Sequence, residues 1–248
     1  GYWFPVLMLL WLFIYFLNAC AWYIIVRDDK KSHVPFSKIY KFTISGFALN
    51  YATPMGLMGG EPYRIMELSP YVGTEKATSS VILYVMMHIF THISFWFLSI
   101  FLYIALYPVD WMMGILLVLI STACLLAIYF FFKGYKNGMA VKTLQFLQHI
   151  PYIKRWARRF SEEKKEQLVR IDCQISQLHR QHKRTFYGAF LLEMLGRLGG
   201  CFEVWLILNI LTHDVSFPDC ILIMAFSSLF SNLFFFSPMQ LGVREGGL

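Results

Sequence analysis

The chain has 248 residues, of which 57% are hydrophobic, 18% aromatic and only 15% charged, and its mean hydropathy is +0.52. Because soluble domains are about 45–50% apolar and about 25% charged, this composition excludes a disordered chain and a collagen-like fibre, and it argues against a water-soluble globule. The 22 lysines and arginines outnumber the 15 acidic residues. Such an excess is typical of the cytoplasmic loops of membrane proteins rather than of nucleic-acid binding.

Five apolar runs are candidates for membrane-spanning helices, each of which needs about 20 residues. Their ranges are Trp3–Val26, Ser79–Tyr107, Trp111–Phe132, Phe186–Leu211 and Phe217–Phe236. A further apolar segment is shorter and interrupted by glycine and proline, as re-entrant or broken segments are; it covers residues 44–58. The sequence therefore predicts an all-α polytopic helical bundle with re-entrant helices, in a single transmembrane domain over residues 1–248. Since the chain starts at Gly1 and stops in a glycine-rich stretch, we expect a fragment that lacks an N-terminal helix and C-terminal helices.

The basic residues orient the predicted spans. They concentrate in residues 27–41 and 133–184, and none occurs in the short connections around Asp110 and Asp214. By the positive-inside rule, the loops 27–41 and 133–184 are cytoplasmic. Residues 44–58 must then enter and leave the membrane on the same side. Because irregular backbone at membrane depth requires protein or water around it, we also expect a cavity there.

The basic loop 133–184 has a helix of its own. Ser161 and the glutamates that follow it are a good helix start, and apolar residues from 168 to 178 recur at helical spacing. This amphipathic helix could pack on the membrane domain or lie on anionic headgroups.

Two glycine- and proline-interrupted segments resemble each other. Residues 54–61 and 238–245 share the pattern Pro-Met-x-Leu-x-x-x-Glu, and each carries an arginine near its glutamate. Matching broken segments in two halves of a membrane protein indicate an inverted repeat and a central transport site; a chance similarity over four identities is the alternative. The candidate substrate-binding residues in these segments are Pro54, Gly59, Gly60, Glu61, Arg64, Pro238, Gly242, Arg244 and Glu245.

A second group of charges lies inside the run 186–211. Glu193 and Arg197 are four residues apart, so they share a helix face and can neutralise one another, and Glu203 lies on the same helix. Because a charge at mid-bilayer depth costs at least about 2.5–3.5 kcal/mol, we expect Glu193 and Arg197 to bind substrate in a polar interior. An internal ion pair that only pins helices together is the alternative. The arginines suit a lipid phosphate, and the glutamates suit a cationic headgroup, a proton or the positioning of the arginines.

Two histidines are weak candidates for a metal site. His88 and His92 are four residues apart in the second run and could supply two ligands, but the sequence offers no third ligand nearby. Hydrogen bonding between packed helices is the better interpretation. Motifs for nucleotides, dinucleotides or a hydrolase nucleophile are not found, so we expect no cofactor and no metal.

Several motifs together resemble the lysylphosphatidylglycerol synthase transmembrane family, the flippase-like domains of the multiple peptide resistance factor and of stand-alone bacterial relatives. The matching stretches are residues 46–54, residues 59–64 with their Gly-Glu-x-x-Arg pattern, Gly73 with residues 77–81, and the ending Pro238-x-x-x-Gly242-x-x-Glu245-Gly246. The charged residues of the family's next helix are absent around residues 84–87, where the sequence instead has His88 and His92 nearby.

The resemblance implies a protein that moves a lipid rather than making it, because the synthetase domain of the multiple peptide resistance factor is not in this sequence. We therefore expect a multi-pass protein of the bacterial inner membrane that translocates a phospholipid or lipid-linked headgroup between leaflets. We expect its partner to be a membrane lipid that is anionic or aminoacylated, and we expect no nucleic-acid binding. A homo-oligomer is one possible assembly. A membrane-embedded transferase acting on a lipid carrier is the main alternative. An accessory protein that recruits partners through its basic loop is another.

Overall fold

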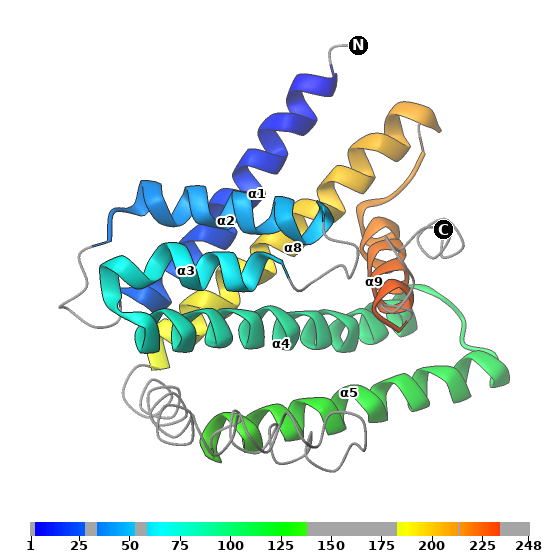
Figure 1. Cartoon of the computed structure of the whole chain (residues 1–248). Helices are drawn as coiled ribbons and strands as arrows, with labels where there is room; N and C mark the ends of the chain where they lie inside the picture. The colour runs from blue at the N-terminus through cyan, green and yellow to red at the C-terminus, as the bar shows by residue number, and fades with distance from the viewer. Residues whose placement is uncertain (1–2, 28–33, 53–58, 138–182, 213, 234–248) are drawn as a thin grey trace.

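Every element in the described part of the chain is an α-helix. The computed structural model describes residues 3–27, 34–52, 59–137, 183–212 and 214–233. Its helices are α1 (Trp3–Val26), α2 (Phe36–Ala52), α3 (Gly60–Val72), α4 (Thr74–Leu106), α5 (Trp111–Asn137), α8 (Lys183–Leu211) and α9 (Phe217–Leu233) (Figure 1). The predicted all-α fold is confirmed.

Four of these helices are long and apolar enough to cross a bilayer. They are α1, α4, α5 and α8, with apolar spans of 24, 33, 23 and 28 residues, whereas the apolar helix at 217–232 is shorter. The four spans coincide with predicted runs to within a few residues. The prediction of a polytopic membrane protein is therefore confirmed.

Helices α2 and α4 begin several residues earlier than predicted. Helix α2 begins at Phe36, within the predicted loop 27–41, and α4 begins at Thr74 rather than at the predicted Ser79. Gly73 has a φ of +83°, which favours glycine, and its backbone N–H donates to the Ser69 carbonyl to end α3. Glu75 then lies in the first turn of α4, where a negative charge complements the helix dipole.

Helices α2 and α3 form an antiparallel hairpin. The C-terminal end of α2 contacts the N-terminal end of α3 through Asn50 and Gly60, and the Phe42 ring of α2 lies 6.4 Å from the Tyr71 ring near the end of α3. The chain thus turns back on itself here, whereas entry and exit of residues 44–58 on the same side of the membrane stays a prediction. Residues 53–58 of that segment lie outside the described residues.

Glycines allow α2 and α3 to approach closely. A Cβ on Gly60 would clash with the backbone carbonyl oxygen of Gly46, and a Cβ on Gly46 would lie 2.5 Å from Nε of Arg64. Glycine at both positions therefore removes the side chains that would separate the helices and displace this arginine.

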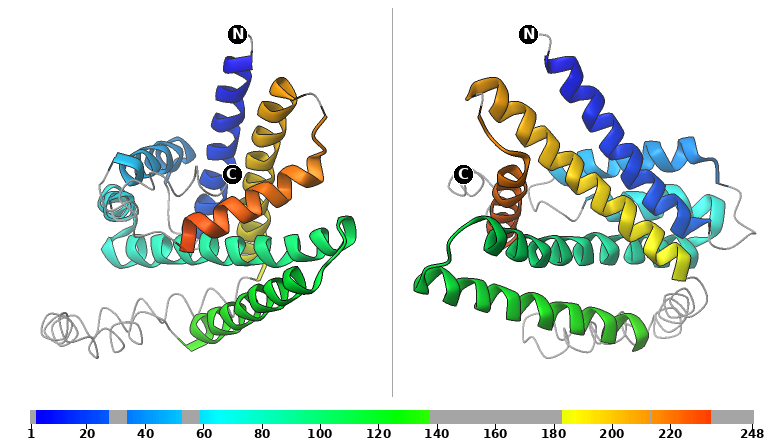
Figure 2. Two further views of the ribbon diagram at one scale, coloured as in Figure 1. Left: turned by 90° about the vertical axis from the view of Figure 1, so that its right-hand side faces the viewer. Right: turned by 180° about the vertical axis from the view of Figure 1, so that it is seen from behind.

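Helix α8 packs antiparallel along α1, and glycines again allow the two helices to approach closely. A Cβ on Gly188 would lie 3.2 Å from Ile24, and one on Gly199 would lie 2.9 Å from Ile14. Figure 2 shows α1 and α8 running together, with α4 crossing them and α5 on the far side of α4. This crossing brings the middle of α8 against the middle of α4.

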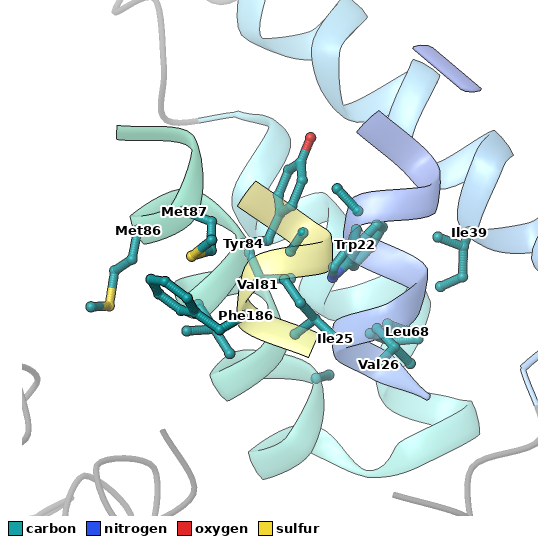
Figure 3. Close-up of a cluster of buried hydrophobic side chains, with 14 of the residues drawn as sticks. Trp22, Ile25, Val26, Ile39, Leu68, Val81, Tyr84, Met86, Met87 and Phe186 are labelled. Atoms are coloured by element: carbon teal, nitrogen blue, oxygen red, sulfur yellow. The ribbon is translucent and has the colours of Figure 1, made fainter. Parts of the chain in front are cut away.

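The buried apolar core lies where α1, α2, α3, α4 and α8 meet (Figure 3). Trp22 and Leu68 are fully buried, and the Trp22 ring lies 6.0 Å from that of Tyr84. By contrast α5 exposes large apolar side chains, with Trp111 at 86% and Met112 at 81%. An apolar face of this extent is expected to contact lipid.

Two predictions fall outside the described residues. They are the amphipathic helix of the basic loop, over residues 161–178, and the second motif, over residues 238–246. The same holds for the final residues of the fifth apolar run.

The Gly60 contact predicts that a single added methyl group lowers the stability of the protein. Gly60→Ala should lower the free energy of unfolding by about 1–3 kcal/mol, because the methyl overpacks the α2–α3 contact. The measurement is thermal unfolding of the detergent-purified chain. Gly114→Ala is the control, since its methyl meets only Val109 at 3.6 Å and alanine is favoured in a helix. Equal unfolding midpoints for Gly60→Ala and the wild type would contradict this packing.

Candidate functional site

The candidate site is built on facing polar stripes of two membrane helices. His88 and His92 lie one turn apart on α4, and Glu193 and Arg197 lie one turn apart on α8. Residues four apart in a helix share a face. The crossing of α4 and α8 places these two faces against each other.

Glu193 is paired with His88. The carboxylate is buried, with an exposed fraction of 1%, and its Oε2 lies 2.7 Å from Nδ1 of His88. Since a carboxylate only accepts hydrogen bonds, His88 donates from Nδ1. The other oxygen, Oε1, is buried and accepts no hydrogen bond from the described residues.

Arg197 makes two hydrogen bonds to α4. Its Nη1 donates to Nδ1 of His92 over 2.8 Å, and its Nη2 donates to the backbone carbonyl of His88 over 3.0 Å. A guanidinium has no acceptor, so His92 accepts at Nδ1 and is neutral. Nε of Arg197 is buried and has no hydrogen-bond partner among the described residues.

The charges therefore pair across the helix interface. Glu193 and Arg197 share a face of α8, as predicted, but the described residues contain no ion pair between them within 4.0 Å. Each charge is held by a histidine of α4 instead. These contacts are the helix-packing hydrogen bonds that the sequence favoured for His88 and His92. The described residues contain no group of three or more metal-ligating side chains.

A cavity of about 240 Å³ opens beside this cluster. His88, His92, Glu193 and Arg197 all line it. The remaining lining comes from α1, α2, α4, α8 and α9: Trp11, Ile14, Tyr15, Asn18, Phe47, Tyr51, Phe95, Gly196, Gly200, Met224 and Ser228. A pair of buried opposite charges thus borders a mainly apolar and aromatic space.

Arg64 is a second buried cation near the cavity. Its exposed fraction is 1%, and its Cζ lies 4.7, 5.3 and 5.8 Å from the ring centroids of Phe47, Tyr84 and Trp22 respectively. Ring faces attract a cation, so these rings replace part of the water that the guanidinium lacks. Its Nη2 also donates to the Thr43 carbonyl over 3.4 Å.

The turn of the α2–α3 hairpin is held by Asn50. Its Oδ1 accepts from the Gly60 backbone N–H over 2.7 Å, and its Nδ2 donates to Oε1 of Glu61 over 3.1 Å. The same Oε1 lies 3.7 Å from Nη1 of Arg64. Oε2 of Glu61 is buried without a hydrogen-bond partner among the described residues. The predicted Gly-Gly-Glu-x-x-Arg motif therefore forms one connected cluster.

One layer of rings separates the two charged clusters. The Phe47 ring lies over Arg64 and also lines the cavity, and Tyr84 lies between Arg64 and His88. The predicted residues of α3 and α8 are thus neighbours, but only those of α8 border the cavity. Glu203 does not line the cavity itself, but its Oε1 accepts from Nε1 of Trp11, a lining residue, over 2.7 Å.

Five predicted site residues lie outside the described residues. They are Pro54, Pro238, Gly242, Arg244 and Glu245. Their meeting with Arg64 at one pocket stays a prediction, as does the inverted repeat.

Comparison with known proteins places the chain in a family. The family model described as the lysylphosphatidylglycerol synthase TM region matches residues 1–248, the whole chain. The chain belongs to this family. Searches of curated proteins and of solved structures gave no significant match. Membership indicates a membrane protein linked to lipids.

Sequence reasoning missed several residues of this family member's site. Nothing in the sequence marks Trp22 or Thr43 as a site residue, because aromatic residues and threonines are common in apolar helices. Tyr84 was detectable, because Tyr84, His88 and His92 recur every four residues along one face of α4. Asn50 lay within the matching motif without an assigned role.

The Asn50 contacts predict a stability change. Asn50→Ala should lower the free energy of unfolding by about 1–3 kcal/mol, because it removes the acceptor of the Gly60 N–H and the donor to the Glu61 carboxylate in a partly buried turn. Thermal unfolding in detergent measures the change.

Asn232→Ala is the matched control. Asn232 is exposed, and among the described residues it bonds only to the Ser228 carbonyl one turn earlier, so its loss should change stability by no more than about 0.5 kcal/mol. Equal effects of the two substitutions would show that Asn50 does not hold the hairpin turn.

Proposed function

We propose that this protein translocates a phosphate-bearing lipid headgroup between the leaflets of the membrane, and that the headgroup passes through the cavity beside Glu193 and Arg197. The observation that carries this proposal is a buried pair of opposite charges bordering a cavity between membrane helices. Buried charges in membrane helices are costly and usually line a substrate or ion pathway. Membership of a lipid-linked family supports a lipid as the substrate.

The free atoms of the cluster suit such a headgroup. No described residue accepts from the buried Nε–H of Arg197, and a guanidinium binds phosphate oxygens through several donors at once. Oε1 of Glu193 also has no hydrogen-bond partner among the described residues, and a carboxylate oxygen can accept from an amine. The pair therefore suits an anionic phospholipid, and also an aminoacylated one that carries both charges.

The size of the cavity supports a headgroup rather than a whole lipid. Pockets that enclose drug-sized ligands have about 300–1,000 Å³, and this cavity has about 240 Å³. The acyl chains would stay outside along apolar surfaces, such as the groove of about 670 Å³ between α4, α5 and α9. In this proposal only the polar group crosses the protein interior.

The two glycine- and proline-interrupted segments, residues 54–61 and 238–245, complete the proposed pathway. Arg64 and Arg244 would bind phosphate from opposite halves, with Glu61 and Glu245 pairing or coupling to them. Half-helix ends that meet near the midplane are typical of secondary transporters. The remaining proposed contacts are the backbone positions of Pro54, Gly59, Gly60, Pro238 and Gly242.

The proposed setting is the bacterial inner membrane, with loops 27–41 and 133–184 on the cytoplasmic side. Their basic residues support this orientation through the positive-inside rule.

A leaflet-accessibility assay tests the proposal. In proteoliposomes that contain a headgroup-labelled phospholipid, Arg197→Gln should slow translocation by about tenfold or more, because charge-assisted hydrogen bonds contribute about 1.5–3 kcal/mol each. Arg184→Gln is the matched control, because Arg184 is exposed on the same helix and should leave the rate unchanged.

The unfolding midpoint of each variant checks that Arg197→Gln is folded before its rate is compared. Equal rates for folded Arg197→Gln and the wild type would contradict the assigned role. Chemical conversion of the lipid, instead of its movement, would favour the transferase alternative.

A further inference from the structure

We propose that His88 takes up one proton when a phosphate-bearing headgroup enters the cavity, so that headgroup and proton bind together. This inference rests on the proposed function and adds the coupling ion to it.

The two histidines are not equivalent. His92 accepts from Arg197 at Nδ1, so a proton on that nitrogen would lose the bond and face a cation. His88 donates from Nδ1 to Glu193, and it keeps this bond when a second proton is added at Nε2. The hydrogen bonds therefore leave His88 as the histidine that can become charged.

His88 is also placed to receive a proton. Its side chain lines the cavity and has an exposed fraction of 36%, compared with 1% for the side chain of its partner Glu193. Its Nε2 makes no hydrogen bond to a described residue. A proton arriving through the cavity thus reaches this nitrogen without breaking a contact.

The charge balance links the proton to the anion. With both histidines neutral, Glu193 and Arg197 sum to zero. A phosphodiester adds one negative charge, and an unbalanced charge in an interior of low dielectric is costly. A proton on His88 restores neutrality, and by linkage each of the two ligands then strengthens binding of the other.

The other ionisable groups around His88 do not replace it. They come from α1, α2, α3, α4 and α8, and they are Tyr15, Tyr51, Arg64, Tyr84, His92, Glu193 and Arg197. Tyrosines and arginines already carry their protons at neutral pH and cannot take up another, and uptake by Glu193 instead of His88 would persist in a His88→Asn variant. Arg64 lies behind rings, with Glu61 at 3.7 Å. Helix α9 contributes Met224 and Ser228, which carry no charge.

Isothermal titration calorimetry of the full chain in detergent tests the inference. Dihexanoylphosphatidylglycerol is titrated at pH 7.5 in buffers of different ionisation enthalpy, because the dependence of the measured heat on that enthalpy gives the number of protons taken up. We expect about one proton per bound lipid for the wild type, because one proton on His88 offsets the single negative charge of the phosphodiester.

Matched asparagine variants assign the proton. Asparagine reproduces the hydrogen-bonding position of Nδ1 but does not titrate. His88→Asn should reduce the uptake to about zero, whereas His92→Asn should change the affinity without changing the number of protons. Dimethyl phosphate, used as a second titrant, separates binding of the phosphodiester alone from binding of the lipid, and uptake with either titrant supports the inference.

Wild-type protein gives a test that does not depend on the variants. Its affinity for the lipid should fall about tenfold for each pH unit above pH 7.5, as uptake of one proton requires. Binding without proton uptake, or uptake that persists in His88→Asn, would overturn the inference and leave the proposed function standing. Failure of the wild type to bind either titrant would contradict both.

Discussion

The account depends on the neutralisation of charges that are buried between membrane helices. In α8, a carboxylate and a guanidinium lie one turn apart, and both are held by histidines of α4. This cluster has a consequence for the fold, because α4 and α8 must cross at the level of these residues. It also bears on the proposed function, because each charged side chain lines a cavity and keeps one buried polar atom without a hydrogen-bond partner among the described residues.

The α2–α3 hairpin also buries a charge, that of Arg64, but stabilises it mainly with aromatic rings. Arg64 is buried among three aromatic rings, with one carboxylate at 3.7 Å, and glycines let the hairpin close around it. The Phe47 ring belongs to this cage and to the cavity wall. The position of Arg64 and the shape of the cavity are therefore coupled through one side chain. This coupling offers a physical route by which a hairpin movement would alter the cavity.

Much of the fold could be predicted, because long apolar runs and basic loops follow directly from the cost of burying polar groups in lipid. The cost of burying a charge in lipid also identified Glu193 and Arg197 as candidate site residues. The partners of these residues could not be predicted in the same way, since helical spacing shows that they share a face but not which helix meets that face. His88 and His92 have the matching spacing, yet a pairing across more than a hundred residues depends on the tertiary crossing. Likewise, α2 begins at Phe36, and its first turns were assigned to a loop because Lys38 and Lys41 resemble loop residues.

The most direct test of the central claim is to locate the lipid on the protein. A phosphatidylglycerol analogue with a photoreactive diazirine on its headgroup is crosslinked to the membrane-embedded protein, and the labelled peptides are mapped by mass spectrometry. The account predicts labelling of cavity-lining residues from separate helices, such as Tyr51 of α2 and Met224 of α9, and competition by unlabelled lipid. Labelling confined to the exposed face of α5, with the cavity residues unmodified, would contradict it.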